Sequence, residues 1–290
     1  MIRAGVAKFP NSAHLFKFCH KVLADQKGGK VHDQEVGAVL NFNPSDCSHW
    51  KRGEKNVRSV FALAKLAEQL GLEVSLVHDI AAGAIGLDEA YFEYLEARNF
   101  RNATASIARH GFELDAVRNR VDMFVADLHA KIDFLTPPLY LPEVFRFFPF
   151  IATQSIDMLD KLSRILRVKQ GQYMIQFKKG ELKPQTRMSL SKDLARILFE
   201  AERLRFATLG PLDASVVEFE KLLFCSSLLV PKAILAEEMA KLNYRQNIIA
   251  ELATLFWVPK SLVSFQVQDI LRRGKPVHSI VTSVEKSIHA

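Results

Sequence analysis

Apolar residues recur at helical spacing along most of the chain. Between residues 13 and 83 the periodic runs are short, with polar breaks at 28–29, 41–44, 53–56 and 71, which predicts several short helices. The segment 88–130 is also predicted to be helical, with a weak break near His110–Gly111. The same periodicity predicts further helices over 154–166, 190–204, 214–229, 246–256 and 259–273.

Only one stretch alternates in the way that strands do. In 167–184, two such runs flank Gln170–Gly171, and Gly180 and Pro184 end the second run, which predicts a hairpin and the beginning of a small sheet. The apolar segment 134–151 contains four prolines, so we expect buried irregular chain with a short helix there, not a membrane span. The sequence therefore predicts a mainly α chain with a small sheet.

Composition restricts the picture further. A chain of 290 residues has room for two packed units at roughly 100–200 residues each. Three cysteines without a CxxC pair argue against a disulfide framework or a zinc finger. The N-terminus lacks the pattern of a secretory signal, so we expect a cytoplasmic protein. The net charge of +7 is compatible with a polyanionic partner, although it is weak support for one.

The segment 33–72 has the pattern of a helix-turn-helix. Such a unit needs a small residue on its first helix, apolar residues that join the two helices, and a polar first turn on the second helix. Gly37 or Ala38 meets the first need, and Ser45 is the expected cap of the second helix. The joining residues and the polar turn are supplied by Val36, Val39, Leu40, Cys47 and Trp50, and by Ser45, Asp46, Ser48 and His49.

This segment resembles the Cro and phage-repressor class of helix-turn-helix proteins, the XRE family. The resemblance rests on Gln34-Glu35, Ala38, Ser45, Ser48, Trp50, Lys51-Arg52-Gly53 and the Leu63–Ala67 run. It implies a five-helix DNA-binding domain over 1–83 and a homodimer on a double-stranded DNA operator with two half-sites. On the family's scheme the DNA-binding residues are Gln34, Ser45, Asp46, Ser48, His49, Lys51, Arg52 and Lys55.

Two features of this segment fit less well. Asp46 repels phosphate unless it accepts a hydrogen bond from a cytosine amine. Asn41–Phe42 stands where a glycine commonly makes the turn. The plainer interpretation, in which Trp50 and its neighbours are only a helical core and the cations a solvated face, stays open.

A second set of runs resembles the ImmA/IrrE family of small zinc metallopeptidases. It consists of Arg187-Met188-Ser189, the stretch from Phe224 to Pro231, and Leu252-Ala253 with Phe256 and Val258. The resemblance implies an α+β zincin-like domain over 117–273. The segment 84–116 would then be a helical connector, and 274–290 a loosely held tail.

The metal-binding residues of that family are missing. Its two histidines and glutamate are replaced by Lys192, Asp193 and Arg196, and only Glu218, or with less support Glu220, keeps the place of the acidic ligand. Cationic side chains offer no lone pair to a metal, so we expect no catalytic residue, no metal and no cofactor. We expect Lys192 and Arg196 to pair with Glu218 in this degenerate site, the alternative being unrelated surface charges.

These patterns together predict a sequence-specific transcriptional regulator, most simply a repressor, that is associated with the nucleoid when it is bound to DNA. Its second domain would dimerise, or sense a small-molecule or protein effector. The HExxH, GxSxG, GxGxxG and GxxxxGK[ST] signatures are all absent. Two alternatives stay open: a peptidase with a rearranged site that cleaves a repressor or itself, and an antitoxin or phage-immunity protein with autoregulatory DNA binding.

Overall fold

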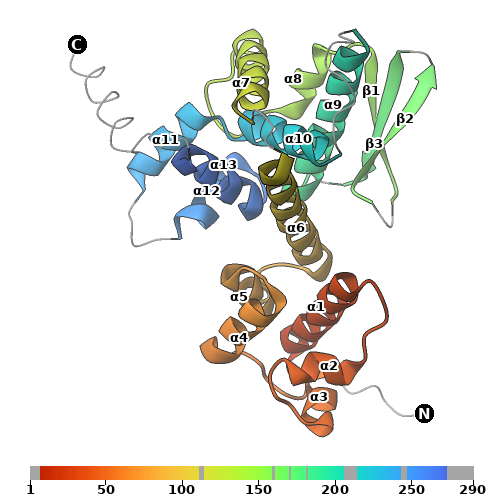
Figure 1. Ribbon diagram of the computed structural model, residues 1–290, viewed down its shortest axis with the longest axis vertical. Helices are drawn as coiled ribbons and strands as arrows, with labels where there is room; N and C mark the ends of the chain where they lie inside the picture. The colour runs from red at the N-terminus through yellow and green to blue at the C-terminus, as the bar shows by residue number, and fades with distance from the viewer. Residues whose placement is uncertain are drawn as a thin grey trace. The chain divides into compact units, whose positions relative to one another are not determined.

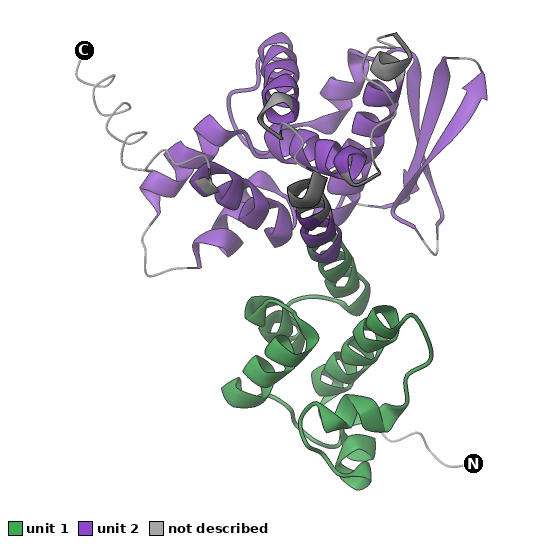
Figure 2. Cartoon of the chain, in the orientation of Figure 1, with its two compact units in different colours: residues 1–97 green, residues 98–290 purple. Residues whose placement is uncertain are grey.

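The computed structural model describes residues 7–110, 114–158, 161–169, 171–180, 182–205, 214–242 and 247–272. These residues form thirteen helices and a three-stranded sheet (Figure 1), so the predicted mainly helical chain with a small sheet is confirmed. The chain divides into two compact units, residues 1–97 and 98–290 (Figure 2). Helix α6 (Leu87–His110) contributes to both units. The predicted tail, 274–290, lies outside the described residues.

The first unit is a set of short helices around one apolar core. The predicted breaks separate its helices, which are α1 (Pro10–Lys27), α2 (Asp33–Ala38), α3 (Pro44–Lys51), α4 (Val60–Leu70) and α5 (Val74–Ala82). The beginning of α6 packs on the same core, where Ala90 and Tyr94 are buried. Tyr94 also donates a hydrogen bond to the Asp25 carboxylate on α1, at 2.8 Å.

Trp50 fixes α3 to α1 in this unit. Its side chain is fully buried, and its ring meets the rings of Phe16 and Phe42 edge-on. The indole Nε1 donates to the carbonyl oxygen of Ser12 at 2.8 Å, so the one polar atom of the ring is satisfied. One face of α3 is thereby set against the core, and the opposite face is left to solvent.

Helices α2 and α3 cross at very close range. A Cβ atom added at Gly37 would lie 2.8 Å from the Cβ of Cys47, which leaves no room for any other residue at this position. Gly37 is buried whereas Ala38 is exposed, so Gly37 is the small residue at the crossing. The turn between the helices contains Asn41 at φ 59°, a left-handed conformation that asparagine tolerates better than most residues. Asn41 thus supplies the left-handed residue of this turn, the position at which a glycine was expected.

The second unit combines a small sheet with helices. Its strands are β1 (Ile151–Ile156), β2 (Ser163–Lys169) and β3 (Gln172–Lys178), in the order β1-β3-β2. Strands β2 and β3 are antiparallel, and β1 is parallel to β3. Its helices, besides the end of α6, are α7 (Leu114–Lys131), α8 (Leu141–Arg146), α9 (Pro184–Arg205), α10 (Ala214–Leu229), α11 (Lys232–Lys241), α12 (Ile248–Phe256) and α13 (Lys260–Arg272).

The helix predicted over 154–166 is wrong, because strands β1 and β2 occupy most of that segment. Met158, Leu162 and Ile165 happen to recur at helical spacing, but pairing with β3 satisfies the backbone of the two strands instead. Ile165 lies opposite the fully buried Ile175. The predicted hairpin is confirmed, with Gly171 in its turn at φ 74°.

Apart from α11, which none of the predicted runs covers, the remaining helices of this unit agree with the periodic runs. Helix α9 begins earlier than predicted, at Pro184, a residue that fits the first turn of a helix. Its apolar side packs against β2, β3 and α10. Among the described residues, no single helix has the length and apolar character to cross a membrane. Helices α12 and α13 reach that length and apolar character only when taken together, and the pair is bent by 111°.

Candidate functional site

The solvent face of α3 is the candidate site of the first unit. Asn43 caps this helix by accepting a hydrogen bond from the backbone N–H of Asp46 at 2.8 Å, and Pro44 occupies its first position. The cap predicted at Ser45 is therefore wrong, since a proline at the first helical position places the cap one residue before it. Ser45 instead lies exposed in the first turn.

The predicted base-reading residues share this exposed face. Ser48 and His49 lie three and four residues after Ser45, on the same side of the helix, and all three are exposed. The hydroxyl of Ser48 donates to the carbonyl oxygen of Pro44 at 2.9 Å, along the helix itself. Gln34 is exposed in the first turn of α2, the helix that crosses α3. The structure therefore brings these side chains to one solvent-facing region.

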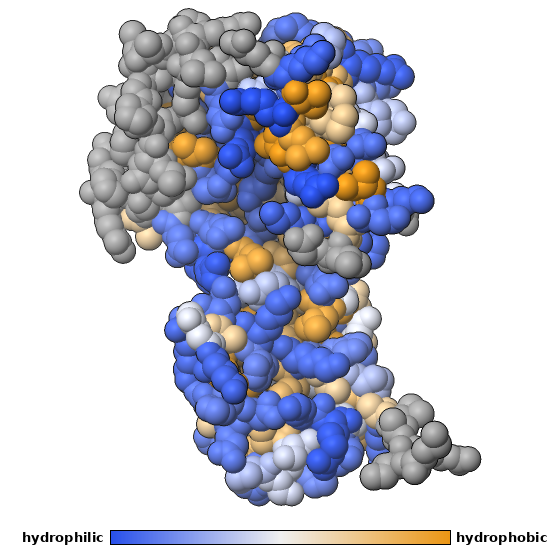
Figure 3. Space-filling model, turned by 90° about the vertical axis from the view of Figure 1, so that its right-hand side faces the viewer, coloured by the Kyte–Doolittle hydropathy of each residue, from blue (hydrophilic) through white to orange (hydrophobic). Residues whose placement is uncertain are grey.

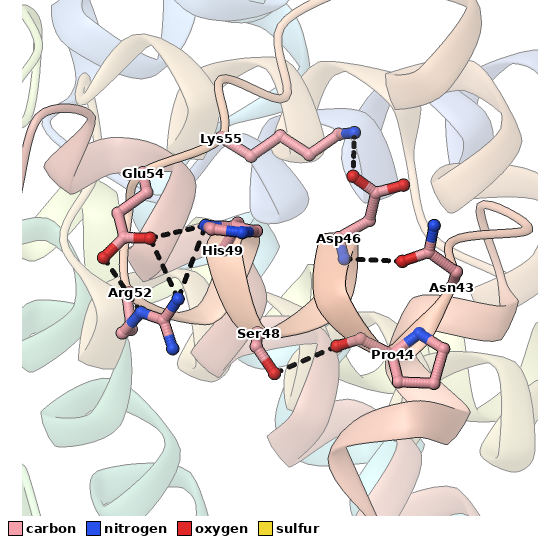
Figure 4. A network of polar contacts seen from close by, with 8 residues as sticks. All are labelled: Asn43, Pro44, Asp46, Ser48, His49, Arg52, Glu54 and Lys55. Atoms are coloured by element: carbon pink, nitrogen blue, oxygen red, sulfur yellow. Dashed lines mark hydrogen bonds and ion pairs between the residues drawn. The ribbon is translucent and has the colours of Figure 1, made fainter.

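Each predicted phosphate-binding cation forms an ion pair within the unit (Figure 4 draws those of Arg52 and Lys55). Arg52 Nε lies 2.9 Å from Glu54 Oε1, and Lys55 Nζ lies 2.7 Å from Asp46 Oδ1. The third pair joins Lys51 Nζ to Asp33 Oδ2 at 2.5 Å. Asp46, the unexpected acid on this helix, thus neutralises Lys55, and the formal charges of the three pairs cancel.

Glu54 is the residue of this region that sequence reasoning missed. Gly53, at φ 70°, turns the chain after α3 so that the Glu54 backbone N–H donates to the His49 carbonyl oxygen at 2.8 Å. The Glu54 carboxylate then accepts hydrogen bonds from Arg52 and lies 2.5 Å from His49 Nδ1. These contacts, with that of Arg52 the largest, lower the pKa of Glu54 to about 2. Gly53, directly before Glu54, is the sequence signal that could have suggested that the chain folds back toward α3.

The positions of the second unit that were predicted to replace a metal site lie around Asp193 on α9. The Ser163 hydroxyl, from β2, donates to Asp193 Oδ2 at 2.6 Å and lies 2.5 Å from the Ser189 hydroxyl. Burial raises the pKa of Asp193, which the Ser163 hydrogen bond and then the nearby charges of Arg196, Lys221 and Lys192 counteract in part. The site thus combines two hydroxyls and one carboxyl group with three cations close enough to lower the pKa of that carboxyl group.

Arg196 and Glu218, which were expected to pair with each other across this site, have other partners. Arg196 pairs with Glu200 one turn further along α9, at 3.2 Å, and Glu218 pairs with Lys221 on α10. Glu220 is buried and pairs with Arg120 of α7. Lys221, whose side chain is 14% exposed, is the cation of this site that the sequence did not indicate.

Few side chains that could bind a metal ion lie near Asp193. Among the described residues, no three histidine, cysteine, aspartate or glutamate side chains gather closely enough to hold a metal ion. Cys225 on α10 is buried, and its thiol donates to the Met188 carbonyl oxygen at 3.5 Å, as expected for a core residue. The polar groups of this site are therefore its two hydroxyls and its charged side chains.

The interpretation of both candidate sites rests on the residues described above. No protein-family model matches the sequence, and none of the curated proteins compared with it matches.

Proposed function

We propose that this protein is a sequence-specific DNA-binding regulator, most simply a repressor, of the XRE helix-turn-helix type. One observation carries the proposal: the face of α3 opposite Trp50 presents Ser45, Ser48 and His49 to solvent, on a helix that crosses α2 at the contact of Gly37 with Cys47. Short polar side chains in the first turns of such a second helix suit base edges in the major groove.

Binding at this face exchanges one set of ion pairs for another. Lys51, Arg52 and Lys55 must leave Asp33, Glu54 and Asp46 to reach phosphates. These pairs are largely exposed, and exposed pairs hold their partners weakly. The displaced carboxylates stay near the DNA and repel misplaced phosphates, so the acids favour one register on the duplex over nearby ones.

The experiment is a selection of bound sequences from random duplex DNA, carried out with the full chain and four variants. We expect Ser48→Ala and His49→Ala to change the preferred base at particular operator positions, and Arg52→Ala to weaken binding to all sequences alike. Ser75→Ala, an exposed serine of α5, is the matched control and should behave as the unmodified chain. Unchanged affinity and preference in the Ser48, His49 and Arg52 variants, here called the α3 variants, would exclude α3 as the reading helix.

We propose that a homodimer binds the operator, with the start of α4 at the contact between copies. Phe61 and Val60 are 89% and 65% exposed, which is unusual for large apolar side chains on a folded surface. Phe61→Glu should yield a monomer in analytical ultracentrifugation and weaken binding to a two-half-site operator far more than to one half-site. A dimer that persists in this variant would place the contact elsewhere.

The second unit is proposed to be a catalytically inactive ImmA/IrrE-like domain that dimerises or binds an effector. The support comes from Lys192, Asp193 and Arg196 at the predicted metal positions, beside the hydroxyls of Ser163 and Ser189. Incubation of the chain with a repressor of this class, with and without zinc, tests the inactivity. Cleavage that is lost in Asp193→Ala would overturn it in favour of a peptidase.

A further inference from the structure

The positive charge of the chain is concentrated on the β2–β3 hairpin of the second unit. Between residues 161 and 179 there are six basic residues and no acidic one, while the whole chain has a net charge of +7. We call this segment the basic hairpin; its cations are Lys161, Arg164, Arg167, Lys169, Lys178 and Lys179. Unlike a charge spread over the whole surface, one gathered on a single hairpin creates a local positive potential.

These six side chains are exposed to solvent. Arg164 Nε donates to the neutral Gln176 Oε1 at 2.8 Å, and Arg167 lies over the Tyr173 ring at 5.6 Å. Within the described part of the chain, none of the six forms an ion pair. The cations of the α3 region, by contrast, each face an acid. The basic hairpin therefore offers a polyanion more uncompensated positive charge than the α3 region does.

The geometry of the hairpin suits an extended row of phosphates. Arg164 and Lys169 are five residues apart on β2, a span of about 17 Å at roughly 3.3 Å per residue. Duplex DNA carries one negative charge per about 1.7 Å of its axis, so several phosphates face such a span. Figure 3 views the side of the molecule that carries the sheet in Figure 1, and there hydrophilic side chains border a small apolar patch.

Two different roles for these cations fit less well. Cations on an edge strand prevent sheets from pairing edge to edge, which would account for those on β2 but not for Lys178 on β3, the strand that lies between the other two. An anionic membrane would favour a broad apolar surface among the cations. On β2 the large exposed apolar side chains are only Leu166 and Val168, at 39% and 53%.

We propose that the basic hairpin binds the phosphate backbone of duplex DNA and gives the second unit a sequence-independent DNA contact. The inference rests on the proposed function in taking DNA as the polyanion, and it adds a second surface to the one on α3. Such contacts raise affinity for every sequence alike and steepen the dependence of binding on salt concentration.

The test measures binding of the full chain to a random-sequence duplex over a series of salt concentrations. The variant is Arg167→Gln/Lys169→Gln/Lys178→Gln, and the matched control is Arg146→Gln/Lys131→Gln/Lys241→Gln, three exposed cations of the same unit. The two carry the same net charge, and circular dichroism checks that both fold. We expect the hairpin variant to bind at least about tenfold more weakly at low salt, with a salt slope shallower by up to about 2.7, while the control changes little.

Two more measurements separate this inference from the proposed function. If the hairpin variant loses random-sequence binding while the α3 variants leave operator preference unchanged, the hairpin contact stands and the proposed function fails. If the α3 variants change the preference while the hairpin variant binds like its control, the proposed function stands and the inference is overturned. A hairpin variant that keeps duplex binding but loses binding to poly-glutamate would overturn it in favour of an acidic protein partner.

Discussion

Arg187 joins the beginning of α9 to two other segments of the second unit, and its removal should have a large effect. Its Nη1 donates to the carbonyl oxygens of Phe256 at 2.9 Å and Trp257 at 2.6 Å, and its Nη2 donates to that of Leu139 at 2.6 Å. The side chain is only 4% exposed. Burial lowers the pKa of Arg187 to about 10, which still leaves it protonated at neutral pH.

The cost of Arg187→Met follows from these three hydrogen bonds. Methionine keeps much of the apolar stem but leaves three carbonyl oxygens without their donor, two of them at the C-terminal end of α12, where a cation is favoured. Hydrogen bonds to a charged group contribute about 1.5–3 kcal/mol each, or roughly 5–9 kcal/mol for three. Burying the guanidinium costs several kcal/mol, so we expect a net loss of about 3–5 kcal/mol. Arg187→Lys, which cannot reach all three oxygens, should lose less.

The assay uses the two tryptophans of the chain, one in each unit. In a Trp50→Phe background, the fluorescence of Trp257 reports urea unfolding of the second unit alone. The matched control is Arg196→Met, the same substitution at an exposed position on the same helix, for which we expect a change within about 0.5 kcal/mol. A loss at Arg187 no larger than that of the control would refute the reasoning.

Three other positions give independent predictions. Burial lowers the pKa of His129, whose Nε2 lies 2.9 Å from the Leu228 carbonyl oxygen, so stability should fall as pH drops below about 6.5, and His129→Gln should flatten that slope in thermal melts. Burial raises the pKa of Asp193, so its stabilising contribution is present below the ordinary value of 3.8 and is lost as pH rises through the raised pKa. Asp193→Asn, which keeps an acceptor for Ser163, should therefore melt higher at neutral pH; a lower melting temperature would contradict this. Gly37→Ala should destabilise the first unit by about 1–3 kcal/mol on Trp50 fluorescence, while exposed Ala38→Ser changes it by less than about 0.5 kcal/mol.

Periodicity predicted most of the helices because their buried faces are continuous. It failed over 154–166, where Met158, Leu162 and Ile165 recur at a spacing that a helix would use. There β1 pairs with β3, which follows β2 along the chain, and no local pattern contains such a contact. The hairpin was predictable because its two strands are adjacent and Gly171 marks the turn.

The exposed face of α3 was predictable from the same periodicity, but the partners of its charges were not. Lys51 pairs with Asp33 of another helix, and the pair of Arg52 with Glu54 depends on the turn made by Gly53. Such contacts are set by tertiary packing and loop geometry. In the second unit, likewise, the residues at 192, 193 and 196 could be singled out from the sequence. The approach of Lys221 to Asp193 could not, because it depends on the packing of α10 against α9.

The pairing of charges changes what the net charge of the chain means for DNA binding. At α3 each cation already faces a carboxylate, so a phosphate replaces an existing partner and the gain in attraction is small. Contacts of this kind would add affinity for every sequence, but less than contacts made by uncompensated cations would. The basic hairpin has no such internal partners among the described residues, so phosphates there meet uncompensated charge. If both surfaces bind DNA, the salt dependence of binding should therefore come mainly from the hairpin, and the choice of sequence from α3.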